Sequence, residues 1–265
     1  QVFPPLCWRH SSARAGPIRP ACPRLDGTRD LIAGVRSAYE QRALGMERVT
    51  TGSGQAPRIV PLGDSAVLVR FGSDLDEAAN RNALALAAEL LRLPITGVLE
   101  IVPSLVSVLV RYDPQAIDGW RLAGEIGLRL THRPCDLDTK THRIGVLFDG
   151  PDLAEVAEAL GLSVADFINR HNEQALRVLT TGFAPGFVYC GFHAPELVVP
   201  RRTAVRPKVA VGSVLFAAGQ TAIAATEIPT GWHVIGHTGF RNFEPERDPP
   251  TRLRAGDMVV FEAAP

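Results

Sequence analysis

Apolar residues recur at two spacings in the first half of the chain. Between residues 61 and 149, stretches with an apolar residue at every second position alternate with stretches where apolar residues recur every three or four positions. The first spacing is typical of strands and the second of helices. The expected elements, in chain order, are a strand at 66–71, a helix at 76–93, strands at 97–101 and 105–112, a helix at 114–130 and a strand at 142–148. This β-α-β-β-α-β order predicts a ferredoxin-like domain over residues 58–149.

The pattern changes after residue 150. Two short helices are expected first, because Asp152 with Glu155 and Ser163 with Asp166 have the spacing of capping boxes. Short β-type runs bounded by Gly and Pro follow, at Leu176 and Val178, 209–217, 222–225, 233–235 and 257–262. Runs of this kind are typical of barrel strands. We therefore predict an α+β protein, with two short helices leading into a β-barrel over residues 150–265.

Residues 1–57 show neither spacing. The segment begins with Gln, carries eight Arg and has five Pro within its first 25 positions. Without an apolar period it has nothing with which to pack against a domain. We expect a disordered or wrongly translated leader, with Met46 as a plausible start.

Aromatic residues and a turn signal open the barrel region. Phe183, Phe187 and Tyr189 alternate at period two, with Pro185 and Gly186 between them. Such residues pack one face of a bent strand, or they line a binding cleft where the backbone turns beside a ligand. Both interpretations remain open, and they are compatible.

Four cations lie within eight residues, at Arg201, Arg202, Arg206 and Lys208. They are either a solvated loop or a site for an acidic small molecule, because Arg offers a bidentate grip on carboxylates. On an extended segment adjacent arginines face opposite ways, so they are not expected to matter equally.

Two further polar positions are candidates for chemistry. Gln220 and Thr221 follow Gly219 on a run of small residues, and Gln220 is the best candidate for orienting a ligand. His171 ends the second short helix, where a histidine serves either as an acid or base or as a partner of the helix dipole.

Five ordered blocks carry a family resemblance. They are G-F-x-P-G-F-x-Y-x-G (182–191), P-R-R (200–202), G-S-V (212–214), G-Q-T (219–221) and P-x-G-W-x-x-I-G-x-T (229–238). This order closely resembles the allophanate hydrolase subunit 1 family, which also contains the 5-oxoprolinase B subunits, a sporulation kinase inhibitor and one half of the carboxyltransferase region of urea carboxylase. The resemblance covers about four fifths of the chain and implies that the C-terminal domain is a cyclophilin-like β-barrel.

The resemblance implies an activity that the chain does not perform alone. The favoured expectation is an ATP-dependent hydrolase subunit of the 5-oxoprolinase type, which opens 5-oxoproline to glutamate together with a homologous second subunit (subunit 2 or C type) and a third subunit. One alternative is an allophanate hydrolase or urea carboxylase carboxyltransferase subunit, with biotin as cofactor. The other is a binding module that inhibits a histidine kinase.

The candidate residues follow from the blocks and the polar positions together. The catalytic candidates are Gln220, Arg202 and His171. The candidates for binding the small acidic amide substrate are Phe183, Pro185, Gly186, Phe187, Tyr189, Arg201, Arg206, Gly219, Thr221, Trp232 and Thr238.

Composition excludes several classes of function. Lys+Arg and Asp+Glu both number 28, so net charge gives no reason to expect nucleic acid or an anionic membrane as partner. The cysteines at 7, 22, 135 and 190 lack CxxC spacing, His233 and His237 lack a third ligand, and no metal site is expected. No apolar run reaches 18 residues, and a reducing cytoplasm fits best. The sequence lacks G-x-x-x-x-G-K-[ST], so ATP is not expected on a P-loop of this chain.

Overall fold

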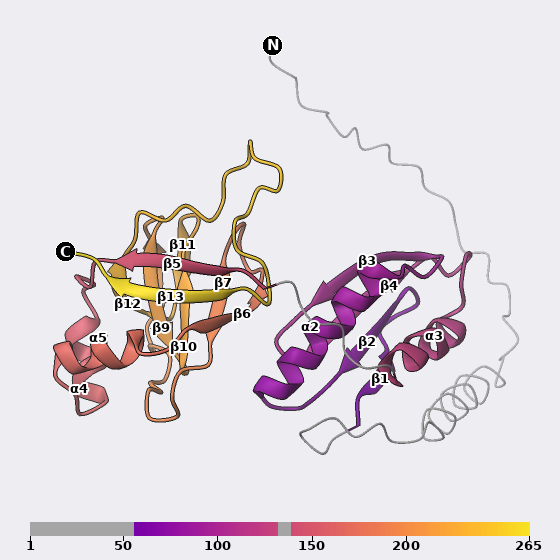
Figure 1. Cartoon of the computed structure of the whole chain (residues 1–265), viewed down its shortest axis with the longest axis horizontal. Coiled ribbons are helices and arrows are strands. Elements are labelled where there is room, and N and C mark those ends of the chain that lie inside the picture. The colour runs from indigo at the N-terminus through magenta and orange to yellow at the C-terminus, as the bar shows by residue number, and fades with distance from the viewer. Residues whose placement is uncertain (1–55, 132–138) are drawn as a thin grey trace, which may run out of the picture. The chain divides into compact units, whose positions relative to one another are not determined.

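The computed structural model describes residues 56–131 and 139–265 (Figure 1). The leader expected over residues 1–57 lies outside the described residues, apart from its last two. The described residues form α+β structure, which confirms the predicted fold class. We call residues 58–131 the N-terminal lobe and residues 139–265 the barrel lobe, and describe each by itself. Within the described ranges, no helix is both long enough and apolar enough to cross a bilayer.

The N-terminal lobe is an antiparallel sheet with two helices on one face. Its elements are β1 (Arg58–Pro61), β2 (Ala66–Arg70), α2 (Glu77–Arg92), β3 (Val98–Pro103), β4 (Ser107–Tyr112) and α3 (Gly119–Thr131). The four strands lie in the order β1-β2-β4-β3. Helix α2 begins where the Asp76 carboxylate accepts a 2.8 Å hydrogen bond from the Ala79 amide. The apolar face predicted for this helix is buried, as expected.

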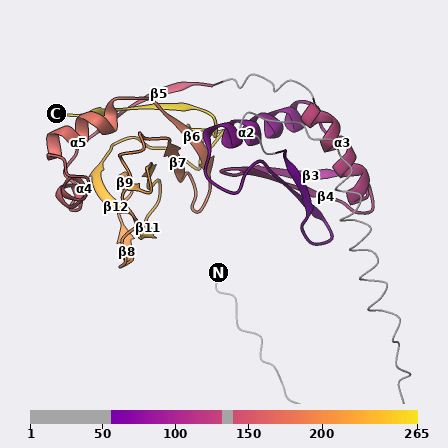
Figure 2. The same ribbon diagram turned by 90° about the horizontal axis from the view of Figure 1, so that it is seen from below.

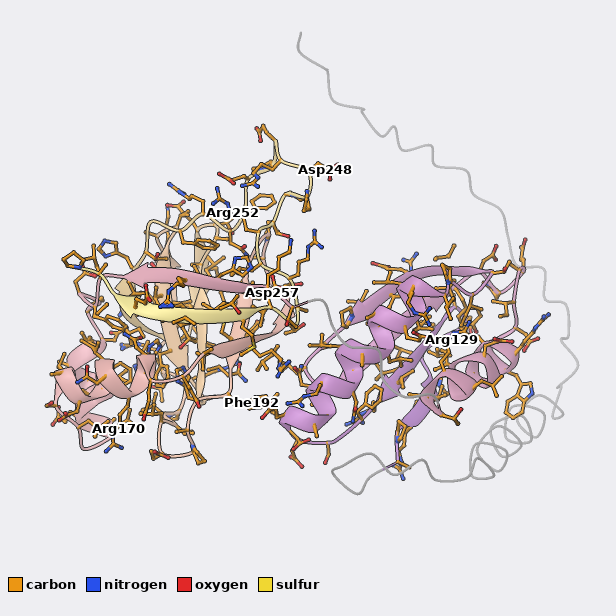
Figure 3. All side chains as sticks on the ribbon, viewed as in Figure 1. Arg129, Arg170, Phe192, Asp248, Arg252 and Asp257 are labelled. Carbon is orange, nitrogen blue, oxygen red and sulfur yellow. The ribbon has the colours of Figure 1, made fainter. Side chains whose placement is uncertain are left out.

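The strand expected to complete this sheet belongs to the barrel instead. Strand β5 (Thr141–Val146) pairs in parallel with β13 (Met258–Ala263), and β1 forms the edge beside β2. The buried Asp257 carboxylate fixes this pairing, since it accepts hydrogen bonds from the Lys140 amide at 3.1 Å and from the Arg254 amide at 3.0 Å. Asp257 lies at the start of β13 (Figure 3). Alternation correctly predicted a strand here, but alternation does not specify which sheet a strand joins.

A curled sheet forms the barrel lobe (Figure 2). Its remaining strands are β6 (Leu176–Thr181), β7 (Val188–Gly191), β8 (Arg206–Val209), β9 (Ser213–Ala217), β10 (Gln220–Ile223), β11 (Ile228–Thr230) and β12 (His233–His237). Seven strands follow the order β12-β9-β10-β7-β6-β13-β5, and β11 pairs with β8 in a separate ribbon. The predicted return of the last strand into the barrel is confirmed by the pairing of β13 with β5 and β6.

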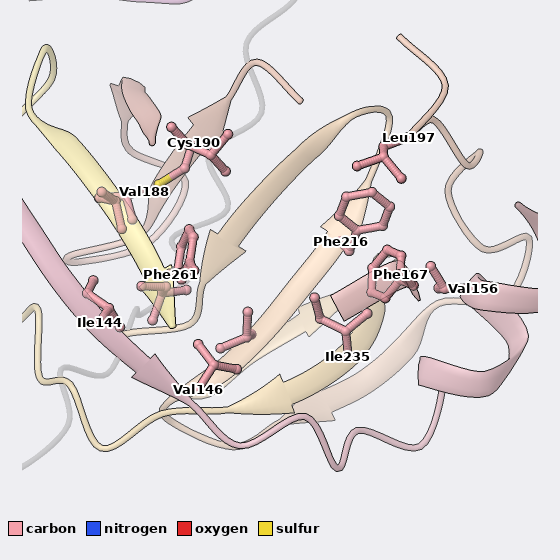
Figure 4. Close-up of a cluster of buried hydrophobic side chains, with 14 of the residues drawn as sticks. Ile144, Val146, Val156, Phe167, Val188, Cys190, Leu197, Phe216, Ile235 and Phe261 are labelled. Carbon is pink, nitrogen blue, oxygen red and sulfur yellow. The ribbon is translucent and has the colours of Figure 1, made fainter. Parts of the chain in front are cut away.

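The two edges of the curled sheet meet. Leu147 and His237 exchange backbone hydrogen bonds of 2.9 Å, which joins the end of β5 to β12. The close approach needs glycine, because a Cβ placed at Gly236 would lie 2.2 Å from the Leu147 carbonyl oxygen. The closed sheet surrounds an apolar core, drawn in Figure 4, to which Phe167, Phe216 and Phe261 contribute fully buried rings.

The two short helices are α4 (Leu153–Ala159) and α5 (Val164–Asn172), as expected. Ser163 caps α5, because its hydroxyl accepts from the Asp166 amide at 3.1 Å and donates to the Asp166 carboxylate at 2.6 Å. The capping box predicted at Asp152 is wrong, since its side chain makes no cap hydrogen bond. That carboxylate is buried and accepts hydrogen bonds from Arg202 and Arg206 instead.

Candidate functional site

A tight turn positions the aromatic residues. The Phe187 amide donates to the Ala184 carbonyl at 3.0 Å across Pro185 and Gly186. Gly186 has φ +68°, and a Cβ at this position would lie 2.6 Å from the Cβ of Phe243. Proline followed by glycine with positive φ is the signature of a type II turn. The turn predicted from the sequence therefore requires both residues for its geometry.

Four rings follow one another from this turn across one face of the sheet. Phe183 contacts Phe187 with ring centroids 5.5 Å apart, Phe187 contacts Tyr189 at 4.9 Å, and Tyr189 contacts Trp232 at 5.9 Å. The guanidinium of Arg201 lies over the Trp232 ring, 5.6 Å from its centroid. We call these five residues the aromatic surface; all five were predicted as substrate-binding candidates.

Phe183 stands out within the aromatic surface. Its side chain is 68% exposed, and its φ of 74° is unusual for a residue other than glycine. Left-handed backbone at such a residue costs on the order of 1 to 3 kcal/mol, and residues of this kind cluster at ligand-binding sites. The exposed ring of Phe183 is not part of the barrel core, so packing in that core does not explain its left-handed backbone.

Two of the three candidate arginines are bound to acidic side chains. The buried Asp152 carboxylate accepts from Arg202 Nη1 at 2.8 Å and from Arg206 Nη2 at 2.8 and 2.9 Å. It also accepts from the Val234 amide at 2.8 Å, and Arg202 makes a second contact of 3.1 Å with Glu155. We call Asp152, Glu155, Arg202 and Arg206 the arginine cluster. It joins the start of α4 to β8 and to β12.

Arg201 differs from its neighbour in both direction and partner. The backbone at Arg202 is held beside Gly231, whose carbonyl accepts from the Arg202 amide at 2.7 Å. Arg201 is exposed, lies over Trp232, and has no carboxylate partner among the described residues. Burial raises the pKa of the Tyr189 phenol, and the nearby positive charge of Arg201 partly opposes this rise. Among the three candidate arginines, Arg201 is thus the one that is not bound to Asp152.

His171 lies on the other side of the sheet, inside the barrel core. Its Nε2 is 2.8 Å from Thr221 Oγ1, and its Nδ1 is 2.7 Å from Asn172 Oδ1. A second histidine, His193, places its own Nε2 2.8 Å from the same threonine hydroxyl. We call His171 and His193 the histidine pair. Burial lowers the pKa of His171 to about 4, and burial together with the neighbouring His171 lowers the pKa of His193 to about 2.

The proton positions of the histidine pair follow from its partners. Both rings are neutral near pH 7, so each carries one N–H. Asn172 Oδ1 only accepts, so His171 donates from Nδ1 and accepts the Thr221 hydroxyl proton at Nε2. Thr221 then accepts from His193 Nε2–H, which leaves the buried Nδ1 of His193 without a partner among the described residues. The pair is a polar centre of the core, separate from the aromatic surface.

Strand alternation explains this separation. Gln220 and Thr221 are adjacent on β10, so their side chains point to opposite faces of the sheet. Thr221 pairs with Cys190 on the core side, whereas Ala222 pairs with Tyr189, which places Gln220 on the face of the aromatic surface. Of the three catalytic candidates, Gln220 therefore shares a face with the aromatic surface, Arg202 lies in the arginine cluster, and His171 lies in the core.

The remaining candidates have positions that shape the backbone. Gly219 (φ +70°) and Ala218 (φ +52°) form the two-residue turn between β9 and β10, where positive φ at both positions is typical of a type I′ hairpin. Thr238 donates to the Gly145 carbonyl at 2.6 Å and accepts from the Phe240 amide at 3.1 Å. These contacts hold the strand ends in place.

Sequence reasoning missed His193. It follows the aromatic block by two positions and matches no motif, and its contact with Thr221 spans 28 residues. The signal available was a histidine two residues after the end of the strand Val188–Gly191. That signal does not identify a partner for His193, so the histidine pair could be recognised only from the folded structure.

The described residues offer neither an activated nucleophile nor a metal site. Cys190 is fully buried, and burial raises the pKa of its thiol to about 12, which keeps it protonated. Ser213 is also buried. No cluster of three or more metal-ligating side chains occurs within residues 56–131 and 139–265. For ATP, the sequence provides no P-loop.

Comparisons with known proteins agree on one family. Residues 57–253 match the family described as carboxyltransferase domain, subdomain C and D. The B subunit of 5-oxoprolinase from Bacillus subtilis (strain 168) is 35% identical over 219 residues, which cover 77% of this chain and 91% of that protein. The B subunit of 5-oxoprolinase from Escherichia coli O157:H7 is 32% identical over 217 residues, covering 78% and 96%.

Solved structures are similar over a comparable share of the chain. The crystal structure of TTHA0988 has a TM-score of 0.68 and 36% sequence identity, covering 76% of this chain. This chain spans only 40% of the length of TTHA0988. The urea amidolyase of K. lactis has a TM-score of 0.63 at 17% identity, covering 78% of this chain and 15% of that one, and at this identity it shows a shared fold only.

Proposed function

The chain belongs to the family of the carboxyltransferase domain, subdomains C and D, which includes the 5-oxoprolinase B subunits, and from this premise we propose that it is the B subunit of a 5-oxoprolinase. The observation that carries the proposal is the match to the B subunits of two bacteria over 91% and 96% of their lengths. A match of that extent concerns the whole relative and not a shared module. The proposed reaction is hydrolysis of the lactam of 5-oxoproline to give glutamate.

The aromatic surface suits the chemistry of this substrate. 5-Oxoproline is a small five-membered lactam that bears a carboxylate. We place the carboxylate on Arg201, which has no acidic partner among the described residues and is held over Trp232. The ring then packs against the accessible rings of Phe183 and Tyr189. Gln220, on the same face, is proposed to orient the lactam amide by hydrogen bonding.

The chain is proposed to bind and orient substrate, with the activating chemistry supplied by other subunits. An unstrained lactam is stable, and the described residues offer it no activated nucleophile, since Cys190 stays protonated and His171 is enclosed in the core. We therefore propose that ATP is handled by a partner. The partners expected are a homologous second subunit of the C type and a third subunit of the A type.

Reconstitution tests this function directly. The chain is co-expressed with the A and C subunits of a bacterial 5-oxoprolinase, and glutamate formed from 5-oxoproline and ATP is measured by chromatography. The complete mixture should release glutamate, while the isolated chain should release none. Robust turnover by the chain alone, or none by the mixture at any subunit ratio, contradicts the proposal.

A carboxyltransferase activity is the second candidate, because the family description names that domain. Carboxybiotin also carries a carboxylate, for which Arg201 is again the available guanidinium. Under this candidate the chain serves a urea carboxylase or allophanate hydrolase system. Avidin distinguishes the two activities, since it sequesters biotin and should stop carboxyl transfer while leaving 5-oxoproline hydrolysis unchanged.

A further inference from the structure

One face of the N-terminal sheet carries an exposed apolar row. Val60 on β1 lies opposite Leu68 on β2, Leu68 lies opposite Leu109 on β4, and Leu109 lies opposite Val102 on β3. Residues directly opposite in neighbouring strands point to the same side of a sheet. The four side chains therefore form a continuous row across all four strands. We call this row, with the charged residues beside it, the open sheet face.

The helices leave this row uncovered. Helices α2 and α3 pack against the other side of the sheet, where Val67, Val69 and Val108 are at most 1% exposed. On the open sheet face, by contrast, Val60 is 42% exposed and Val102 39% exposed, and the two leucines between them are half-buried. A contiguous apolar strip facing solvent is typical of a surface that binds another protein.

Unpaired positive charge lies along one side of the row. Arg58 and Arg70 are directly opposite each other on β1 and β2, and both are exposed on this face. Like charges in this position destabilise a strand pair. Neither guanidinium has a carboxylate partner among the described residues. Along the other side of the row, Arg111 is already neutralised by Glu100 at 3.2 Å.

We propose that the open sheet face is the docking surface for a partner subunit that presents apolar side chains flanked by carboxylates. The apolar row would pack against the partner's apolar residues, and the partner's carboxylates would neutralise Arg58 and Arg70. This inference rests on the proposed function, which requires partner chains. The length of TTHA0988 supports it, because the counterpart of this chain is only 40% of that polypeptide and the remainder is attached to it covalently.

A second copy of this chain would complement the charges of the open sheet face less well than a different protein with free carboxylates. The strand positions of the open sheet face include one acidic residue, Glu100, and it is already paired with Arg111. In a two-fold dimer formed by this face, Arg58 and Arg70 would meet either themselves or that neutral pair. The repulsion between the two arginines would then remain, so the charges favour a different protein.

Substitution at the centre of the row tests the surface. Leu109→Lys places a charge among the four apolar side chains, and Leu128→Lys is the matched control, since Leu128 is exposed on the helical side of the same lobe. Each variant is co-expressed with the A and C subunits, and assembly is measured by size-exclusion chromatography with light scattering. Leu109→Lys should weaken assembly at least about thirtyfold, as expected for a residue at the centre of an interface, while Leu128→Lys assembles like the wild type.

A rim variant covers the case in which Leu109→Lys fails to fold. Arg70→Glu changes an exposed side chain and relieves its repulsion with Arg58, so circular dichroism should show a folded protein. Its assembly should weaken about tenfold and lose the salt dependence that the wild-type complex shows. Normal assembly of both Leu109→Lys and Arg70→Glu overturns the docking surface.

The outcomes separate this inference from the proposed function. If the wild-type complex forms and releases glutamate while the face variants assemble normally, the surface is wrong and the function stands. If the complex forms without releasing glutamate, and the variants still prevent assembly, the function is wrong and the surface stands. If the wild-type chain binds neither partner, both are wrong. If the isolated chain is a dimer that Leu109→Lys dissociates, the occupant is a second copy and the partner proposed here is wrong.

Discussion

Arg201 and Arg202 are adjacent in sequence but belong to two different regions of the barrel lobe, the aromatic surface and the arginine cluster. Arg201 lies on the aromatic surface, exposed and stacked on Trp232, with no acid beside it among the described residues. Arg202, the next residue, is held with Arg206 on the buried carboxylate of Asp152. The sequence alone does not tell the three arginines apart, but in the structure Arg202 and Arg206 are bound to Asp152 and Arg201 is not.

The same contrast runs through β10. Gln220 faces the side of the sheet that carries the aromatic surface, and Thr221 faces the histidine pair in the core. Alternation thus points the two neighbouring side chains to opposite faces of the sheet, although both are buried. Residues that are neighbours in a motif therefore need not share a role, and substitutions at the two regions should fail in different ways.

Loss of Asp152 should have the largest effect, and it should be an effect on stability. Asp152→Ala leaves Arg202 and Arg206 without their shared acid and the Val234 amide without an acceptor. Breaking a buried ion pair by removing one partner costs on the order of 3 to 5 kcal/mol. Urea unfolding of the isolated variant measures this loss. Asp149→Ala, which removes an exposed partner of His237, should cost less than about 1 kcal/mol, and equal losses would contradict the arginine cluster as a structural unit.

Acid should destabilise the barrel lobe through the histidine pair. The pKa values of the two folded histidines, about 4 and about 2, lie below the unfolded value of about 6.5. The unfolded chain therefore binds more protons below pH 6.5, so the stabilisation is complete above that pH and is lost as the pH falls. At pH 5.5 the free energy of unfolding should be roughly 2 to 3 kcal/mol lower than at pH 7.5.

The control for this pH dependence is His193→Leu, which removes one of the two buried rings. Urea unfolding at a series of pH values between 7.5 and 5.5 should then show about half of the wild-type slope, because one histidine instead of two takes up a proton on unfolding. An unchanged slope would mean that His193 is not buried in neutral form.

Arg201 and Arg202 should separate activity from stability. In the assembled complex, Arg201→Ala should lower kcat/KM for 5-oxoproline about tenfold to hundredfold, as expected for loss of a charge-assisted contact. Its urea midpoint should stay close to the wild type, since the exposed side chain has no ion pair in the described structure. Arg202→Ala should instead lower the urea midpoint. If Arg202→Ala lowered kcat/KM with a normal urea midpoint while Arg201→Ala lowered the urea midpoint, Arg202 would be the residue that binds substrate.

Phe183 should give the smallest effect. Phe183→Ala removes an exposed ring from the end of the aromatic surface without opening the core. An aromatic contact of this kind contributes about 0.5 to 1.5 kcal/mol, so kcat/KM should fall about threefold to tenfold. The melting temperature of the isolated chain should not fall. A lower melting temperature with normal kinetics would assign Phe183 to packing.

Much of the fold could be predicted from local pattern. The buried face of α2, the capped start of α5 and the strand at 141–146 follow from periodicity and capping chemistry, which act over a few residues. The partner of that strand could not be predicted, because β13 is more than 100 residues away and alternation carries no information on pairing. The helix expected at 114–130 begins later, at Gly119, and it buries Leu122 and Ile126 while Trp120 is 49% exposed.

The candidate site shows the same limit. The aromatic surface could be predicted, since its residues fall in motif blocks and three of them alternate on one segment. The use of Asp152 could not, because the carboxylate that the sequence pairs with Glu155 in a cap is bound by arginines 50 and 54 residues away. Partners that are distant in the chain decided which arginine is available.

The account is tested most directly by the preference of the assembled complex for a carboxylate. The measurement is the inhibition constant of 5-oxoprolinamide, which lacks the acid, relative to the KM for 5-oxoproline, in wild-type and Arg201→Ala complexes. The wild type should favour the acid by about tenfold or more, and Arg201→Ala should lose this preference while binding the amide unchanged. A preference that survives in Arg201→Ala, or that disappears in a folded Arg202→Ala complex instead, would contradict the aromatic surface as the site of substrate binding.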